Sequence, residues 1–242
     1  MTTSSSATNE SQRTAGSDDL ALPAELREPL LQHLADLRER YIARGWAGRT
    51  GFGSKPALIV IDMARFWLDA KQQIGSGLQS VLDNTLRVLE AARKAKIPII
   101  FTSYLYDPSQ PPSPHDRKLV MQLPANATEM FELDPRLNRR PHETLLRKRY
   151  ASAFKGTNLH EMLAGLGIDT LIVTGVSTSH CVYATCRDAT DSVRVIVPRE
   201  AVGERCEIMH EVNLLDIDID LGDVMPVSEV VTQLAKTTAA GV

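Results

Sequence analysis

The stretch KPALIVIDM at positions 55–63 decides the fold. Its apolar residues run without a break from Ala57 to Ile61 and are followed directly by Asp62. An unbroken run of this length is typical of a strand that is buried on both faces of a parallel sheet. The stretch therefore predicts a central strand that carries a carboxylate at its C-terminal end.

Helical and strand-like patterns alternate along the rest of the chain. Residues 80–97 carry the apolar spacing of an amphipathic helix, and residues 98–106 form a second apolar strand, which together complete a βαβ unit. The alternation continues with predicted strands at 143–150, 170–176 and 193–199, predicted helices at 158–168, 178–191 and 210–219, and a last strand and helix within 223–236. This order predicts a doubly wound, mainly parallel α/β sheet with helices on both faces.

Length and composition indicate one folded domain. A chain of 242 residues with 43% hydrophobic content can bury one substantial core. Residues 1–22 are rich in polar and small side chains without periodicity, so we expect a disordered tail there and a single domain over 23–242. Leucines three and four positions apart predict a helix at the start of that domain. The proline-rich segment 107–141 is too long for a plain connection, and its role stays open.

Charge and apolar runs point to a small-molecule partner. The net charge is only −3 and no basic stripe appears, so we expect no nucleic-acid binding. No segment approaches the roughly 18 apolar residues of a membrane span, and the N-terminus does not resemble a secretion signal, so we expect a cytoplasmic protein without membrane contact. Three cysteines are too few and too uneven in number for a disulfide scaffold, so at least one thiol should be free.

One of these cysteines lies in the stretch VTGVSTSHCVYATC at 173–186. Cys181 opens a predicted helix just after a predicted strand, where free N–H groups and the helix dipole lower the pKa of a thiol. The small residues 177–179 would let a substrate approach the same N–H groups, which suit the oxyanion of a tetrahedral intermediate. A buried thiol without reactivity is the alternative, because cysteine is among the most buried residue types.

A cysteine nucleophile needs a base and a third group that orients or polarises it. Asp62 at the end of the first strand and Lys148 in RKRYASAF are the candidates. Taken alone, such an aspartate is more often a helix cap or a metal ligand, and such a lysine is more often a solvated charge. Their value as site residues depends on whether the fold brings them to Cys181.

Three motifs together resemble the cysteine hydrolases of the isochorismatase-like superfamily: IVIDM with Asp62, KRYASAF with Lys148 and VTGVSTSHCVYAT with Cys181. The resemblance implies a doubly wound α/β fold and an Asp, Lys and Cys catalytic triad. It also implies that the N–H groups of Ser177 and Cys181 form the oxyanion hole, and that the peptide bond between Val176 and Ser177 is cis.

The resemblance extends over about residues 51–230. Segments 45–67 and 197–227 indicate which branch of the superfamily the chain resembles most. They are most similar to the branch that cleaves N-carbamoylsarcosine and related N-carbamoyl amino acids through a thioester with release of ammonia, while maleamate hydrolases share part of the pattern. This implies that Arg205 grips a substrate carboxylate. It also implies a homo-oligomer, often a tetramer in this superfamily. We expect Phe66 and Trp67 to contribute to substrate specificity together with the 107–141 segment.

Specific residues argue against other functions. An isochorismatase acting on a vinyl ether would not need Cys181, and a non-catalytic member would be expected to have lost part of the triad. A redox or zinc pair is disfavoured because Cys181 and Cys186 are not separated by two residues. His115 and His180 have no partner at metal-ligand spacing, so we expect no catalytic metal and no cofactor.

Overall fold

The apolar run of residues 55–63 forms the central strand of the sheet. In the computed structural model, which describes residues 20–72, 75–119, 123 and 126–240, strand β1 (Pro56–Ile61) is buried along its whole length. It pairs in parallel with β2 (Ile99–Tyr104) on one side and with β4 (Thr170–Val176) on the other. The long apolar run thus has neighbours on both edges and helices over both faces.

Within the described residues, seven parallel strands form one sheet with the order β3-β2-β1-β4-β5-β7 and with β6 paired to β4. The remaining strands are β3 (Thr144–Lys148), β5 (Arg194–Pro198), β6 (Val202–Gly203) and β7 (Asp223–Met225). The strand order reverses between β1 and β4, which is where ligands collect in open α/β sheets. The predicted doubly wound α/β fold is confirmed.

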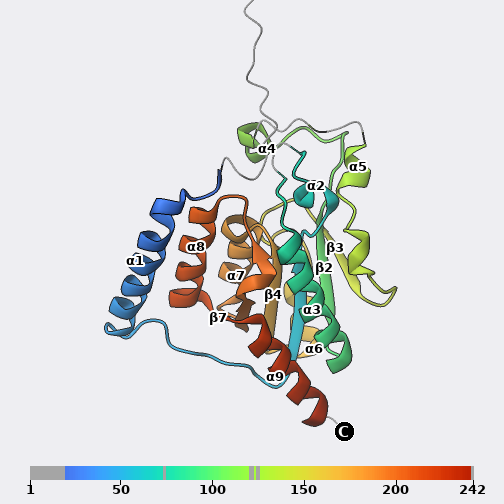
Figure 1. Cartoon of the computed structure of the whole chain (residues 1–242). Coiled ribbons are helices and arrows are strands. Elements are labelled where there is room, and N and C mark those ends of the chain that lie inside the picture. Colours follow the sequence, from blue (N-terminus) through green and yellow to red (C-terminus); the bar gives the residue numbers. More distant parts are fainter. Residues whose placement is uncertain (1–19, 73–74, 120–122, 124–125, 241–242) are drawn as a thin grey trace, which may run out of the picture.

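Helices cover both faces of the sheet (Figure 1). Helices α3 (Gln79–Ala95) and α9 (Val227–Ala240) pack on one face. The other face is covered by α6 (Leu159–Leu166), α7 (Tyr183–Ala189) and α8 (Glu207–Asp216). Along β1, alternate residues belong to the two cores, because successive side chains of a strand point to opposite faces.

The leading helix lies outside these two layers. Helix α1 (Ala24–Ile42) contacts α8 and covers no strand directly, as Figure 1 shows. Of the predicted tail, residues 1–19 lie outside the described part of the chain. Leu22, at its end, is buried, and its N–H donates to the Glu207 side chain at 3.3 Å.

The 107–141 segment is not a plain loop. It contains α4 (Pro114–Leu119), α5 (Ala127–Met130) and a 3₁₀ turn at Pro135–Leu137. Of these short elements, α4 and α5 gather with α2 (Arg65–Leu68) at one end of the molecule in Figure 1. Among the described residues, no helix combines the length and the apolar character needed to cross a bilayer.

Gly175 lets β4 approach β1 closely, and its replacement gives a first prediction. Its φ is +109°, and a Cβ there would lie 2.0 Å from the carbonyl oxygen of Ile61. We expect Gly175→Ala to lower the free energy of unfolding by about 3 kcal/mol or more in denaturant titrations. Gly165→Ala is the control, because nothing lies within 4 Å of a Cβ at that helical position. A Gly175→Ala protein as stable as the control would contradict this reading.

Candidate active site

Three side chains predicted from separate motifs meet at one edge of the sheet. Asp62 follows β1, Lys148 ends β3, and Cys181 follows β4. Because all the strands are parallel, these three positions lie at the same C-terminal edge. The side chain of Lys148 reaches past β2, which separates β3 from β1, and its Nζ lies 2.6 Å from Oδ2 of Asp62.

Asp62 is held from two sides. Thr102, fully buried on β2, donates its hydroxyl to Oδ1 of Asp62 at 2.7 Å and accepts the N–H of Asp62 at 3.2 Å. Oδ2 takes the contact with Lys148. Each carboxylate oxygen therefore has its own fixed partner.

Lys148 is almost fully buried, yet its ammonium group has three oxygen partners. Besides Asp62, Nζ donates to the carbonyl oxygens of Tyr150 at 3.1 Å and Ala151 at 3.0 Å. Burial favours the neutral amine, but the negative charges of Asp62 and of an ionised Cys181 and the hydrogen bonds to these two side chains together outweigh it and raise the pKa of Lys148 above its usual value. Lys148 is therefore a fixed cation with its three protons directed at oxygen atoms.

Cys181 lies in a wide turn that begins immediately after β4. The peptide bond between Val176 and Ser177 is cis. The carbonyl oxygen of Ser177 then accepts the N–H groups of His180 at 3.0 Å and Val182 at 3.2 Å, and residues 178–182 form a π-helical turn before α7 starts. The amide of Cys181 lies between these two donors.

The pKa of the thiol differs from the sequence-based expectation. Burial and the negative charge of Asp62 raise the pKa of Cys181 to about 12, and the nearby charge of Lys148 only partly opposes them. The sequence pattern predicts a lowered pKa at a helix N-terminus, but α7 begins two residues after Cys181, and burial and the charge of Asp62 dominate instead. At rest the sulfur therefore keeps its proton beside a carboxylate that can accept it.

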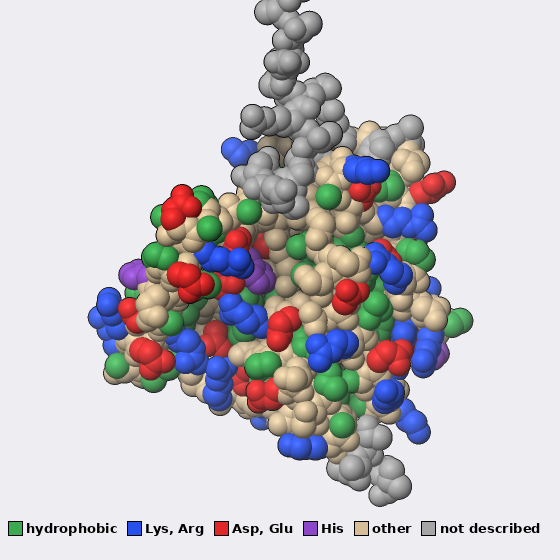
Figure 2. All heavy atoms as spheres, in the orientation of Figure 1, with side chains coloured by type: hydrophobic (Ala, Val, Ile, Leu, Met, Phe, Trp, Pro, Cys, Tyr) green, Lys and Arg blue, Asp and Glu red, His purple; other side chains and the backbone are tan. Residues whose placement is uncertain are grey.

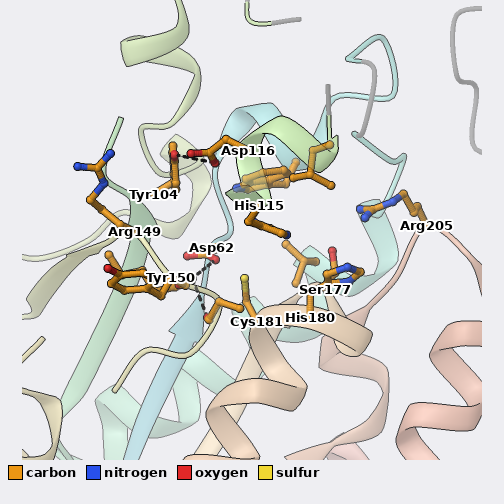
Figure 3. A pocket seen from close by; sticks show the side chains of 15 residues that line it. Asp62, Tyr104, His115, Asp116, Arg149, Tyr150, Ser177, His180, Cys181 and Arg205 are labelled. Carbon is orange, nitrogen blue, oxygen red and sulfur yellow. Dashed lines mark hydrogen bonds and ion pairs between the residues drawn. The ribbon is translucent and has the colours of Figure 1, made fainter. Parts of the chain in front are cut away.

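A cavity of about 80 Å³ opens above these residues (Figure 3). Cys181 directs its sulfur into this cavity beside Asp62, while Arg205 extends its guanidinium toward it from another side. Val176 and Ser177 also line the cavity. The predicted triad, the cis peptide and the predicted carboxylate-binding arginine thus surround one space.

Of the two aromatic residues predicted for substrate binding, only one lines the cavity. Trp67 lines the cavity. Phe66 does not lie along it: this side chain is 1% exposed and packs against Phe131 with ring centroids 4.9 Å apart. The structure thus corrects the prediction for Phe66, because the short helix α2 turns consecutive side chains in different directions and buries this one.

Several residues that line the cavity were not predicted individually, although the 107–141 segment was expected to contribute to substrate specificity. Helix α4, within the 107–141 segment, contributes His115 and Asp116, and Tyr104 at the end of β2 donates weakly to Asp116 at 3.4 Å (Figure 3). Thr102 beneath Asp62 was missed as well. A threonine inside an apolar strand gives no sequence signal of its role, and the place of α4 depends on how the long segment folds back.

Among the described residues, the remaining cysteines and the histidines do not form a second reactive or metal-binding site. Cys186 is fully buried in α7, and Cys206 precedes α8 as a free thiol. In the part of the chain that the structure describes, no three His, Cys, Asp or Glu side chains come together in a way that could hold a metal ion.

On the face shown in Figure 2, basic and acidic side chains are interspersed.

Comparisons with known proteins agree with this geometry. The model of the Isochorismatase domain matches residues 56–229. An N-carbamoylsarcosine amidase of an Arthrobacter species is 36% identical over 203 residues, which cover 80% of this chain and 76% of that protein. A maleamate amidohydrolase of Pseudomonas putida is 34% identical over 197 residues, which cover 78% of this chain and 91% of the relative. The crystal structure of an isochorismatase-like hydrolase from Alkaliphilus metalliredigens superposes with a TM-score of 0.63 and 25% identity, covering 74% of this chain and 98% of that one.

Proposed function

The chain belongs to the isochorismatase family, and we propose that it is an amidohydrolase that uses Cys181 to release ammonia from a small amide bearing a carboxylate. The observation that carries the proposal is the 2.6 Å contact between Lys148 and Asp62 beside the Cys181 thiol, in a cavity that Arg205 also lines. An N-carbamoyl amino acid such as N-carbamoylsarcosine is the proposed substrate, supported by the amidase relative.

The first half of the reaction forms a thioester. Asp62 accepts the thiol proton of Cys181, and the sulfur attacks the carbonyl carbon of the substrate. The N–H groups of Ser177 and Cys181 hold the resulting oxyanion, for which the fixed turn after β4 provides support. The bond from carbon to nitrogen then breaks, the nitrogen takes the proton from Asp62, and ammonia leaves.

The second half regenerates the thiol. A water molecule gives a proton to Asp62 and attacks the thioester carbon, and the bond from carbon to sulfur breaks. The sulfur recovers its proton from Asp62, and the acid is released. With an N-carbamoyl substrate this acid is a carbamic acid, which loses carbon dioxide and leaves the amine. Throughout, Lys148 stays an ammonium and stabilises negative charge on Asp62 and on the sulfur.

Arg205 provides the test of the substrate class. A guanidinium binds a carboxylate through strong, charge-assisted hydrogen bonds. We expect Arg205→Gln to raise KM for N-carbamoylsarcosine by about 10- to 100-fold, measured as ammonia release. For a neutral primary amide, we expect the same variant to leave KM nearly unchanged.

Arg149→Gln is the matched control for Arg205. Arg149 also lines the cavity, but its guanidinium points away from Cys181 in Figure 3. An equal rise in KM in both variants would mean that any positive charge near the cavity contributes equally to binding the substrate carboxylate. In that case the assignment of Arg205 to the substrate carboxylate fails.

Maleamate is the second candidate substrate. It carries a primary amide and a carboxylate in one small molecule, and the maleamate amidohydrolase relative is covered over 91% of its length. The same thiol chemistry applies, with maleate in place of the carbamic acid. Comparison of kcat/KM for the two substrates decides between them.

Assembly and location remain part of the proposal. We propose a homo-oligomer, with a tetramer as the expected form, in the cytoplasm. Support comes from apolar side chains that α8 leaves exposed: Ile208 is 44%, Met209 41% and Val212 43% exposed. Light scattering of the purified protein measures the assembled mass.

A further inference from the structure

A buried carboxylate that the proposed reaction does not use lies directly behind the nucleophile. Glu204 follows β6, which pairs with β4 at Gly175 and Val176, just before the turn that carries Cys181. Its side chain is only 1% exposed. A buried carboxylate is costly unless its oxygens are well hydrogen-bonded.

The two oxygens of Glu204 serve two parts of the site. Oε2 accepts both the N–H of Ser179 at 3.1 Å and the hydroxyl of Ser179 at 2.6 Å. Oε1 accepts the N–H of Arg205 at 2.9 Å and lies 3.8 Å from the Arg205 guanidinium. One carboxylate thus joins the turn before Cys181 to the residue proposed to bind the substrate carboxylate.

Glu204 also has a partner on the cavity wall. Nδ1 of His180 lies 3.9 Å from Oε2 of Glu204 and 2.8 Å from the hydroxyl of Ser179. Burial on its own would raise the pKa of Glu204. The nearby His180 ring, the hydrogen bonds from Ser179 and the charge of Arg205 together outweigh burial and lower this pKa to about 2. The group is therefore ionised at every pH at which the enzyme would be assayed.

We propose that Glu204 is a positioning residue that fixes the nucleophile turn and Arg205 at one separation, so that a substrate held by its carboxylate presents its carbonyl carbon to Cys181. This inference rests on the proposed function. Glu204 itself does not line the cavity, whereas Ser177, His180 and Arg205 do. It therefore acts through its neighbours rather than on the substrate.

The expected effect follows from geometry. When two groups must contact one small molecule at the same time, the reaction rate falls steeply if their separation changes, by about 10²-fold for a misplacement of 1 Å. Replacing Glu204 with Gln keeps the volume but places an NH₂ group where an oxygen accepted an N–H. Either Ser179 or Arg205 then loses its acceptor, and the two parts of the site are no longer tied by one rigid group.

The first experiment compares Glu204→Gln with Glu143→Gln. Glu143 is also buried, pairs with Arg93 at 2.8 Å and accepts the N–H of Arg140, but it lies just before β3, at the end of that strand far from Lys148. Both variants should lose comparable thermal stability. We expect only Glu204→Gln to lower kcat/KM for the carboxylate-bearing substrate, by about 10-fold or more.

A second readout does not need the substrate. The rate at which Cys181 is alkylated by iodoacetate, divided by the rate with neutral iodoacetamide, reports how well Arg205 guides a carboxylate to the sulfur. Removing a negative charge near the cavity would by itself raise this ratio. Loss of positioning lowers it, and we expect Glu204→Gln to lower it by about 5-fold. Mass spectrometry of the Cys181 peptide separates this reaction from alkylation of Cys206.

These readouts separate the two proposals. If the wild type hydrolyses none of the carboxylate amides but the alkylation ratio still falls in Glu204→Gln, the positioning role stands and the proposed function fails. A ratio that stays equal or rises in Glu204→Gln overturns the positioning role. Should Glu204→Gln not fold, Ser179→Ala removes one of the bonds to Oε2 and is expected to lower the same ratio by about 2- to 3-fold; an unchanged ratio there overturns the inference equally.

Discussion

Cys181→Ala is expected to lower the rate of ammonia release by about 10⁴-fold or more, because it removes the sulfur atom that forms the covalent intermediate. The measurement is ammonia release from N-carbamoylsarcosine, maleamate, nicotinamide and a neutral amide by the purified variant. Its fold should persist, because Cys181 lines the cavity and only packs against the edge of the core.

Cys186→Ala is the matched control for this prediction. Cys186 lies five residues further on, is fully buried and packs in the apolar core, and burial is the main cause of its raised pKa. Its replacement is expected to cost about 1–2 kcal/mol of stability and to leave kcat unchanged. Ammonia release that survives in Cys181→Ala, or that is lost equally in Cys186→Ala, would be incompatible with Cys181 as the nucleophile.

Asp62→Asn is expected to separate thiol reactivity from catalysis. Loss of the general base should lower ammonia release by about 10³-fold. The pKa of Cys181 is raised first by burial and then by the charge of Asp62, while Lys148 lowers it. Removing the charge of Asp62 leaves burial and Lys148, so the pKa must fall from its value of about 12. More of the thiol is then ionised at any given pH.

The measurement for Asp62→Asn is the rate of Cys181 alkylation by iodoacetamide between pH 6 and pH 10. We expect the variant to be alkylated faster than the wild type across this range, although it turns over substrate far more slowly. Slower alkylation in Asp62→Asn would contradict the charge arrangement described for the site. Asp169→Asn is a control, because Asp169 precedes β4 at the opposite edge of the sheet.

The fold followed from local patterns, whereas the proposed triad came from the resemblance of three motifs to a known family. The apolar run before Asp62 is typical of a buried strand, and the alternation after it favoured a doubly wound sheet. Where Asp62, Lys148 and Cys181 meet was fixed once the strands were parallel, because their C-terminal ends share one edge. What the patterns did not contain was the strand order, which places β2 between Lys148 and Asp62.

Other features depend on burial and on distant partners. The direction of the pKa shift of Cys181 was missed because it depends first on burial and then on a carboxylate more than one hundred positions away in the sequence. Phe66 and Trp67 are adjacent aromatic residues, and only packing against Phe131 shows which one is covered. Glu204 lies in a short loop without periodicity, so nothing local separates it from a surface glutamate.

The central claim is that Cys181 forms a covalent intermediate with the substrate. The most direct measurement is the mass of the Cys181 peptide in enzyme that is acid-quenched during the first turnover, with ammonia measured in the same samples. The account predicts a peptide heavier by the substrate less ammonia, appearing together with the first equivalent of ammonia. A Cys181 peptide of unchanged mass at every time, while ammonia accumulates through the first turnover, would contradict it.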